Sequence, residues 1–159
     1  MIKIHGVIRM KQVLCEVGEN TYGIDIAKVQ GIEKNLEIVP VPNVDELVEG
    51  IVNLRGIVVP VLSLHRKLHV ESKTNTRETN YIITKLGDLF VGFRVDAVAE
   101  IVEIPEKDFM EVPTIVSNEN TSYIDSIIRV NKKLVLVLDV EGILNEAERK
   151  KITKLVEEA

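Results

Sequence analysis

The stretch that decides the fold is Val48–Leu68, with the sequence VEGIVNLRGIVVPVLSLHRKL. It contains two runs of aliphatic residues separated by the segment NLRG at Asn53–Gly56. Two such runs, rich in β-branched residues and joined through a glycine, predict a pair of strands in a tight hairpin. Gly56 permits the positive φ that a tight turn needs. Arg55 lies in the middle of this apolar stretch, so it either is simply solvated or recognises a partner.

Composition restricts the class of protein to which the chain can belong. The chain has 159 residues, of which 45% are hydrophobic but 4% aromatic, and it has no Trp. A core of Val, Ile and Leu favours β-strands, because β-branched side chains fit a pleated sheet. A chain of this length buries enough surface to fold without a metal or a disulfide. We therefore expect an all-β globular protein of one domain or two small ones.

Charge and cysteine content exclude further classes. The net charge of −5 argues against non-specific binding to nucleic acid or to anionic lipid, both of which need clustered Lys and Arg. No apolar run reaches the ~18 residues of a membrane-spanning helix, so we expect no direct membrane insertion. Cys15 is the single cysteine and cannot form an internal disulfide, which suits a reducing cytoplasm. Its apolar neighbours predict a buried side chain and not a nucleophile.

The chain contains an internal repeat. Val17–Glu19 matches Leu86–Asp88 at an offset of 69 residues, from 17 to 86, without a gap. Val59–Leu64 matches Val135–Val140 at an offset of 76 residues, from 59 to 135. Further aligned pairs are Val13 with Ile82, Tyr22 with Val91, Gly23 with Gly92, Ile26 with Val95, Val29 with Val98, Ile32 with Ile101, and Val52 with Ile128. Two strand-rich copies predict two small β-barrels packed together.

The repeat also predicts the domain organisation. The first barrel subdomain spans residues 10–75 and the second spans residues 76–145, together forming one domain. Whether the first strand completes its own barrel or the other one stays open. A C-terminal helix follows at residues 146–159, where Asn145 and Glu148 form a capping box. The simpler interpretation of this helix is an amphipathic element that closes the core, and the alternative is a docking helix for a partner.

The titratable residues do not assemble into a catalytic site. His65 and His69 could share one helical face, but a metal site needs more ligands and only Glu71 is near in sequence. Asp25 and Asp96 alternate with apolar neighbours, which predicts that both face outward. The sequence has no glycine-rich phosphate loop and no linked nucleophile and base. We therefore expect no enzyme activity, no cofactor and no metal.

Apolar residues of the first copy are the remaining candidates for a functional site. They either fill a barrel core or line a groove between the two copies that accepts a partner helix. A small barrel could also hold a small ligand, although barrels of this size are normally filled by their own side chains. The residues concerned are Val13, Ile26, Val29 and Ile32.

Four segments together resemble the CheW family of chemotaxis coupling proteins. They read GENTYGIDIAKVQGIE, VEGIVNLRGIVVPVLSLHRKL, VGFRVDAVAEIVEI and LVLVLDVEGIL. The resemblance covers about residues 10–145, and the hairpin Gly50–Leu68 is its most specific part. The chain departs from the family pattern at Ser63, where the family often has Asp, and at Gly31 and Ser126.

The resemblance implies a fold and a function. The fold is two SH3-like five-stranded β-barrels packed together, and no catalysis is implied. The function is that of a cytoplasmic adaptor, at receptor arrays, which couples transmembrane chemoreceptors to the histidine kinase CheA. The kinase partner is the C-terminal regulatory domain of CheA, which has a similar fold. A coupling protein of a receptor–kinase pathway outside chemotaxis is the alternative.

The resemblance also implies two sites. The cytoplasmic hairpin tip of a chemoreceptor would lie in a groove between the barrels, and a coupling turn would order the junction between receptor and kinase. An arginine suits that turn because its guanidinium makes directed contacts through several donors. The groove maps onto Val13, Ile26, Val29 and Ile32, and the coupling turn onto Gly50, Asn53, Arg55 and Gly56.

Overall fold

The aliphatic stretch forms the predicted hairpin. In the computed structural model, which describes residues 3–4, 7–71, 75–114 and 122–158, its strands are β5 (Val48–Leu54) and β6 (Ile57–Ser63). The turn residues Arg55 and Gly56 have φ values of 51° and 86°. Positive φ at both central residues matches a two-residue type I′ hairpin, whose twist fits the twist of the strands.

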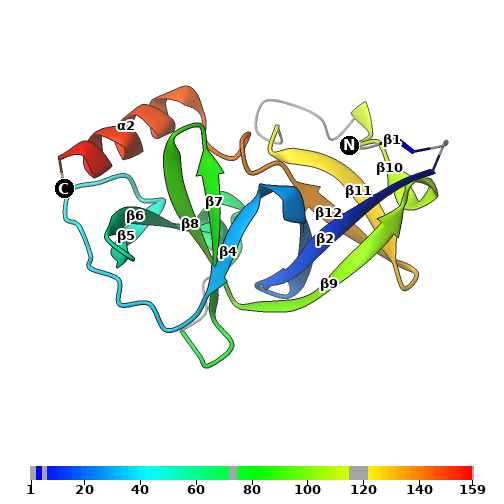
Figure 1. Cartoon of the computed structure of the whole chain (residues 1–159), viewed down its shortest axis with the longest axis horizontal. Coiled ribbons are helices and arrows are strands. Elements are labelled where there is room, and N and C mark those ends of the chain that lie inside the picture. Colours follow the sequence, from blue (N-terminus) through cyan, green and yellow to red (C-terminus); the bar gives the residue numbers. More distant parts are fainter. Residues whose placement is uncertain (1–2, 5–6, 72–74, 115–121, 159) are drawn as a thin grey trace.

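The strands form two sheets (Figure 1). The seven-stranded sheet, here called the larger barrel, has the order β1-β2-β3-β12-β11-β10, and β9 also pairs with β2. The five-stranded sheet, here called the smaller barrel, has the order β4-β7-β8-β6-β5. The remaining strands are β1 (Lys3–Ile4), β2 (Val7–Val17), β3 (Asn20–Asp25), β4 (Val29–Glu33), β7 (Asn80–Leu86), β8 (Leu89–Val95), β9 (Ala97–Pro105), β10 (Phe109–Met110), β11 (Ile124–Val130) and β12 (Lys133–Leu138).

Each sheet takes strands from both repeats. The first hairpin of the chain, β2–β3, pairs with β9 and β12 of the second repeat. The first hairpin of the second repeat, β7–β8, pairs with β4 and β6 of the first. Strand β2, the first strand of the first repeat, therefore completes the barrel that contains the later strands of the second repeat. The residue boundaries of the two subdomains stay a prediction from the repeat.

The two barrels are built by the same contacts. Gly23 faces Val137 in a parallel pair of the larger barrel, and Gly92 faces Val61 in the smaller barrel. Gly23 and Gly92 are repeat counterparts, and so are Val61 and Val137. A Cβ at Gly23 would lie 3.5 Å from its valine, and one at Gly92 would lie 3.7 Å from its own. The internal repeat is therefore a structural repeat with a reciprocal exchange of hairpins.

Both barrels also close in the same way. In the larger barrel, β9 continues through the 3₁₀ turn η2 (Glu106–Asp108) into β10, which pairs with β11. In the smaller barrel, the chain after β4 returns so that Val39 pairs with Ile51. A Cβ at Gly50 would lie 2.4 Å from the carbonyl oxygen of Val39. The absence of a side chain at Gly50 therefore allows the closing segment to cross β5.

Three apolar clusters fill the molecule. A central core lies where the two barrels meet, and one smaller cluster lies in each barrel. The larger barrel contains Leu14, Ile104, Ile128, Val135 and Val137. The smaller barrel contains Val52, Val59, Val61, Tyr81 and Ile83. The predicted all-β fold of two packed barrels is confirmed.

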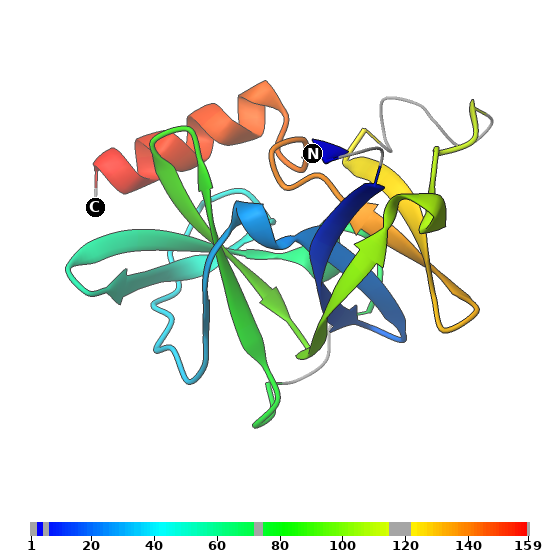
Figure 2. The ribbon, with the colours of Figure 1, turned by 45° about the vertical axis from the view of Figure 1, so that its right-hand side comes forward.

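The helices are short and lie outside the sheets. Helix α2 (Glu146–Glu157) has the predicted capping box between Asn145 and Glu148, and its Ile152 is buried in the central core. Figure 2 shows α2 lying along the smaller barrel. The one-turn helix α1 (Leu64–Lys67) follows β6, and the 3₁₀ turn η1 (Ile26–Lys28) joins β3 to β4. Among the described residues, none of the helices has the length and apolar character needed to cross a bilayer.

Candidate functional site

The first strip of candidate residues lies on η1 and β4. Asp25 caps η1, because its Oδ1 accepts a hydrogen bond of 2.9 Å from the backbone N–H of Ala27. Ile26 begins this turn, and Val29 and Ile32 follow on β4. All three side chains are half-buried and pack against the central core. They therefore present apolar surface while being held in place by the core beneath them.

Val13 has a different position from the other three. Its side chain is fully buried in the central core. Its cross-strand partner on β9 is Ile101, which is 52% exposed. Val13 therefore supports this part of the surface from beneath and does not line it.

The second repeat supplies a matching apolar strip. Val98 and Ile101 on β9 are the counterparts of Val29 and Ile32 at the offset of 69 residues. The strands also share an irregularity, since the register of β4 shifts between Val29 and Gly31 and that of β9 shifts at the equivalent place. Val98 packs against the central core, as Val29 does. Sequence reasoning aligned these residues but did not select them, although the repeat could have done so. We call Ile26, Val29, Ile32, Val98 and Ile101 the central face.

The coupling turn is tied to the central face by an ion pair. The Nη2 atom of Arg55 lies 2.9 Å from Oε1 of Glu33. Glu33 is the last residue of β4, the strand that carries Val29 and Ile32. The Arg55 side chain is 75% exposed and that of Glu33 is 23% exposed, so the pair is open to solvent. The turn is thus linked directly to the first apolar strip.

The other residues predicted for this turn have structural contacts. The backbone N–H of Gly56 donates a 2.9 Å hydrogen bond to Oδ1 of Asn53, which fixes the turn. Gly50 lies at the opposite end of β5, where the closing segment crosses. The structure therefore groups Asn53, Arg55 and Gly56 in one turn and places Gly50 apart from them.

A pocket of about 190 Å³ opens beside Arg55. Its apolar lining comes from Leu54, Ile57, Val59, Ile83 and Phe90. A pocket lined by the repeat counterparts of these residues opens on the larger barrel. There the turn residues Asn131 and Lys132 also have positive φ, at 49° and 68°. The two barrel ends share a backbone, but the smaller barrel alone carries the arginine at this position.

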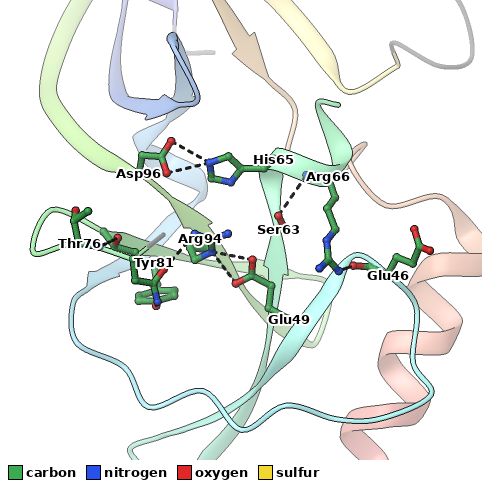
Figure 3. A network of polar contacts seen from close by, with 11 residues as sticks. Glu46, Glu49, Ser63, His65, Arg66, Thr76, Tyr81, Arg94 and Asp96 are labelled. Carbon is green, nitrogen blue, oxygen red and sulfur yellow. Dashed lines mark hydrogen bonds and ion pairs between the residues drawn. The ribbon is translucent and has the colours of Figure 1, made fainter. Parts of the chain in front are cut away.

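Titratable groups elsewhere make buried contacts (Figure 3). Nε of Arg94 donates to both carboxylate oxygens of Glu49 at 2.8 Å. His65 is fully buried, with Nε2 3.0 Å from both carboxylate oxygens of Asp96. The prediction that Asp96 faces outward is therefore wrong, because its side chain binds across the junction of the barrels. Burial raises the pKa of the Cys15 thiol to about 12, so the thiol stays protonated.

The two histidines do not meet. His65 belongs to α1, whereas His69 lies beyond the end of that helix, is exposed and has a φ of 56°. Within the described part of the chain, no three His, Cys, Asp or Glu side chains are grouped as metal ligands would be.

Comparison with known proteins gives the family. The family model of the CheW-like domain matches residues 11–148. The chain belongs to the CheW-like domain family. It is 33% identical over 131 residues to the chemotaxis protein CheW of Helicobacter pylori, covering 82% of this chain and 78% of that protein. It is 29% identical over 147 residues to the chemotaxis protein CheW of Treponema pallidum, covering 90% and 86%.

A solved CheW structure has the same fold. The crystal structure of the scaffolding protein TtCheW from Thermoanaerobacter tengcongensis matches with a TM-score of 0.80 at 26% sequence identity. The match covers 89% of this chain and 96% of that chain. The resemblance read from the four sequence segments is confirmed. The curated relatives are thus named as chemotaxis proteins and the matched structure as a scaffolding protein.

Proposed function

We propose that this chain is a non-catalytic adaptor that couples chemoreceptors to the histidine kinase CheA at receptor arrays in the cytoplasm. Family membership supports the class of protein, and the relatives' names favour chemotaxis over another receptor–kinase pathway. The apolar clusters that fill both barrels argue against a small-ligand-binding barrel.

The central face suits the receptor. It takes one apolar strip from each barrel, and a helical hairpin would contact both strips at once. Amphipathic helices commonly bind by placing apolar side chains against such aliphatic surfaces. Ile101 contributes the most exposed aliphatic side chain of the central face, at 52%. Its removal is expected to weaken receptor binding as much as the removal of Val29.

The turn and its pocket suit the kinase. Arg55 offers a guanidinium beside an apolar pocket, a combination that recognises a partner by charge and by shape. The C-terminal domain of CheA is the partner we assign to this end of the smaller barrel.

The ion pair between Arg55 and Glu33 carries the proposal. Coupling between two binding sites requires a physical connection whose arrangement both sites can bias. Strand β4 supplies this connection, because it bears Val29 and Ile32 on the central face and ends at Glu33 beside Arg55. A receptor bound to the central face therefore contacts the same strand that positions the arginine.

The test is kinase autophosphorylation with receptor membranes, in the presence and absence of this protein. We expect the wild type to activate the kinase, and Val29→Asp, Ile101→Asp and Arg55→Ala to fold normally yet fail to activate it. Val39→Asp is the matched control, because Val39 is 59% exposed outside the proposed surfaces. Binding assays should then separate the sites, with Val29→Asp losing the receptor hairpin and Arg55→Ala losing the kinase domain. Full activation by Val29→Asp and Arg55→Ala would overturn the assignment.

A further inference from the structure

The chain crosses from the smaller barrel to the larger one at a single residue, Asp96. Strand β8 ends at Val95 and β9 begins at Ala97. The backbone N–H of Asp96 donates a 2.8 Å hydrogen bond to the carbonyl oxygen of Glu16. Its Oδ2 accepts a 2.7 Å hydrogen bond from the backbone N–H of Gly18. Asp96 is therefore attached to β2 and to the β2–β3 turn, both in the larger barrel.

His65 holds the same carboxylate from the side of the smaller barrel. It lies on α1, which directly follows β6, and its Nε2 is 3.0 Å from both oxygens of Asp96 (Figure 3). The ring is fully buried, and its Nδ1 has no hydrogen-bond partner among the described residues. Because a carboxylate only accepts hydrogen bonds, Nε2 must carry the proton. The imidazole is thus anchored by one atom, and Asp96 is that anchor.

The other crossing between the barrels is built differently. There β3 passes to β4 through η1, and the repeat offsets make Ala27 the counterpart of Asp96 and Glu141 the counterpart of His65. Glu141 pairs at 3.2 Å with Lys28, and their side chains are 53% and 46% exposed. An exposed pair of this kind contributes little, since water and salt screen it. The crossing from β8 to β9 is therefore held by a buried pair, His65 and Asp96, whereas the crossing from β3 to β4 has only an exposed pair beside it.

We propose that His65 and Asp96 form a positioning pair that fixes the orientation of one barrel relative to the other. Val98 follows Asp96 by two residues, so the direction in which the chain leaves Asp96 determines the position of the strip formed by Val98 and Ile101. The other strip, with Val29 and Ile32, is fixed to the smaller barrel through β4. The pair thereby sets the relation between the two halves of the central face. Its effect on receptor binding rests on the function proposed above, whereas its effect on barrel orientation does not.

The structural test uses Asp96→Asn, which keeps a carbonyl oxygen for the N–H of Gly18. The asparagine NH₂ group would take the place of Oδ1, 3.0 Å from Nε2, and because this group only donates, Nε2–H would lose one of its two acceptors. Nitrogen-15 spectra of the imidazole should show the Nε2–H tautomer in the wild type and a changed Nε2 chemical shift in the variant. Residual dipolar couplings fitted separately for each barrel should show a changed orientation in Asp96→Asn. Glu141→Gln, which alters the counterpart of His65, should leave both measurements unchanged.

The functional test compares two affinities of the same variant. A receptor-derived helical hairpin needs both strips, whereas the isolated C-terminal domain of the kinase contacts the smaller barrel. We expect Asp96→Asn to bind the hairpin about fivefold more weakly or worse, within the usual range of coupling between sites, and to bind the kinase domain as the wild type does.

The outcomes of these two tests decide the proposal. Unchanged dipolar couplings in Asp96→Asn would overturn the positioning pair, as would an equal loss of both affinities together with a lower melting temperature. A changed orientation with a selective loss of hairpin binding would establish it. If the wild type binds neither partner, the proposed function fails, while the couplings still decide whether His65 and Asp96 orient the barrels.

Discussion

Glu33 and Arg55 join the central face to the coupling turn, with Arg55 Nη2 2.9 Å from Glu33 Oε1. The exposure of both side chains means that the pair adds little to folding, at most about 1 kcal/mol. Arg55 also adopts a φ of 51°, and a non-glycine residue in the left-handed region costs roughly 1–2 kcal/mol. The stability of the hairpin therefore does not explain the arginine, which supports the proposal that Arg55 recognises a partner.

Arg55→Asn should separate stability from coupling. Asparagine tolerates the left-handed region, and its counterpart in the other barrel, Asn131, has a φ of 49°. We expect the free energy of unfolding to rise by about 0.5–1 kcal/mol in urea titrations, while receptor-dependent kinase activation is lost. The reciprocal variant Asn131→Arg should lower stability by a similar amount and leave activation intact. Loss of activation in Asn131→Arg would show that the assay responds to turn strain and not to Arg55.

Gly50 should tolerate substitution far less than Gly56. A Cβ at Gly50 would lie 2.4 Å from the carbonyl oxygen of Val39, and backbone atoms would have to move. We expect Gly50→Ala to lower the free energy of unfolding by about 3 kcal/mol, at the upper end of overpacking costs. Gly56 has a φ of 86°, and a Cβ added there would have no atom within 4 Å. Gly56→Ala should therefore lower the free energy of unfolding by about 1 kcal/mol, from backbone strain alone.

A control in the other barrel isolates the clash at Gly50. Ser126 is its repeat counterpart and sits at the same register shift, yet already carries a side chain. Ser126→Ala should change the free energy of unfolding by less than about 0.5 kcal/mol, as measured in the same urea titrations. Equal losses in Gly50→Ala and Gly56→Ala would mean that backbone conformation, and not the approach of Val39, decides the cost.

The predictions that the structure confirms depend on local sequence. The turn at Arg55 and Gly56 and the capping box of Asn145 and Glu148 each involve neighbours in the chain. The two-barrel fold followed from the repeat, because matching apolar patterns must build matching units. Such patterns indicate which face of a strand is buried, and a short segment is enough to show the pattern.

The features that sequence reasoning missed depend on which partner a strand selects. Gly23 pairs with Val137 of the second repeat, although Val61 of its own repeat has an equivalent position and almost the same surface. The sequence pattern therefore cannot tell whether the first hairpin completes its own barrel or the other one. Val13 is buried because its side of β2 faces the central core, while Leu14 on the opposite side faces the interior of the larger barrel. Asp96 alternates as an outward residue does, yet it lies where the chain changes barrel and binds His65.

The buried side chain of Gln12 should destabilise the fold, and its replacement by an apolar side chain should raise the free energy of unfolding. Its side chain is fully buried, and neither its amide nitrogen nor its amide oxygen has a hydrogen-bond partner among the described residues. A buried polar group without a partner costs about 1–3 kcal/mol. Gln12→Leu, which is similar in size, should raise the free energy of unfolding by about 1–2 kcal/mol in urea titrations.

An exposed glutamine provides the control for Gln12. Gln30 lies on β4 with its side chain in solvent, so Gln30→Leu should change stability by less than about 0.5 kcal/mol. A loss of stability in Gln12→Leu would indicate that the wild-type amide is hydrogen-bonded in solution, for instance through an ordered water inside the larger barrel.

Cys15 should make the protein sensitive to alkali. Burial raises the pKa of its thiol from 9.0 to about 12, so the folded state keeps a proton that the unfolded state releases from pH 9 upward. The resulting stability is fully present below pH 9 and is lost as the pH rises towards 12. The loss should approach about 1.4 kcal/mol for each pH unit above the unfolded pKa.

Urea titrations at pH 8, 9 and 10 measure this effect when the wild type is compared with Cys15→Ala. Burial also raises the pKa of Tyr22 and of Tyr81 above 10.0, so both add a loss of stability as the unfolded chain ionises near pH 10, and the comparison cancels that contribution because both proteins share it. Cys15→Ala should be less stable at pH 8, since it leaves a small cavity, but its stability should fall less between pH 9 and 10. Parallel curves for Cys15→Ala and the wild type would mean that another group controls alkaline unfolding. A gap that narrows as the pH rises assigns the loss to the buried thiol.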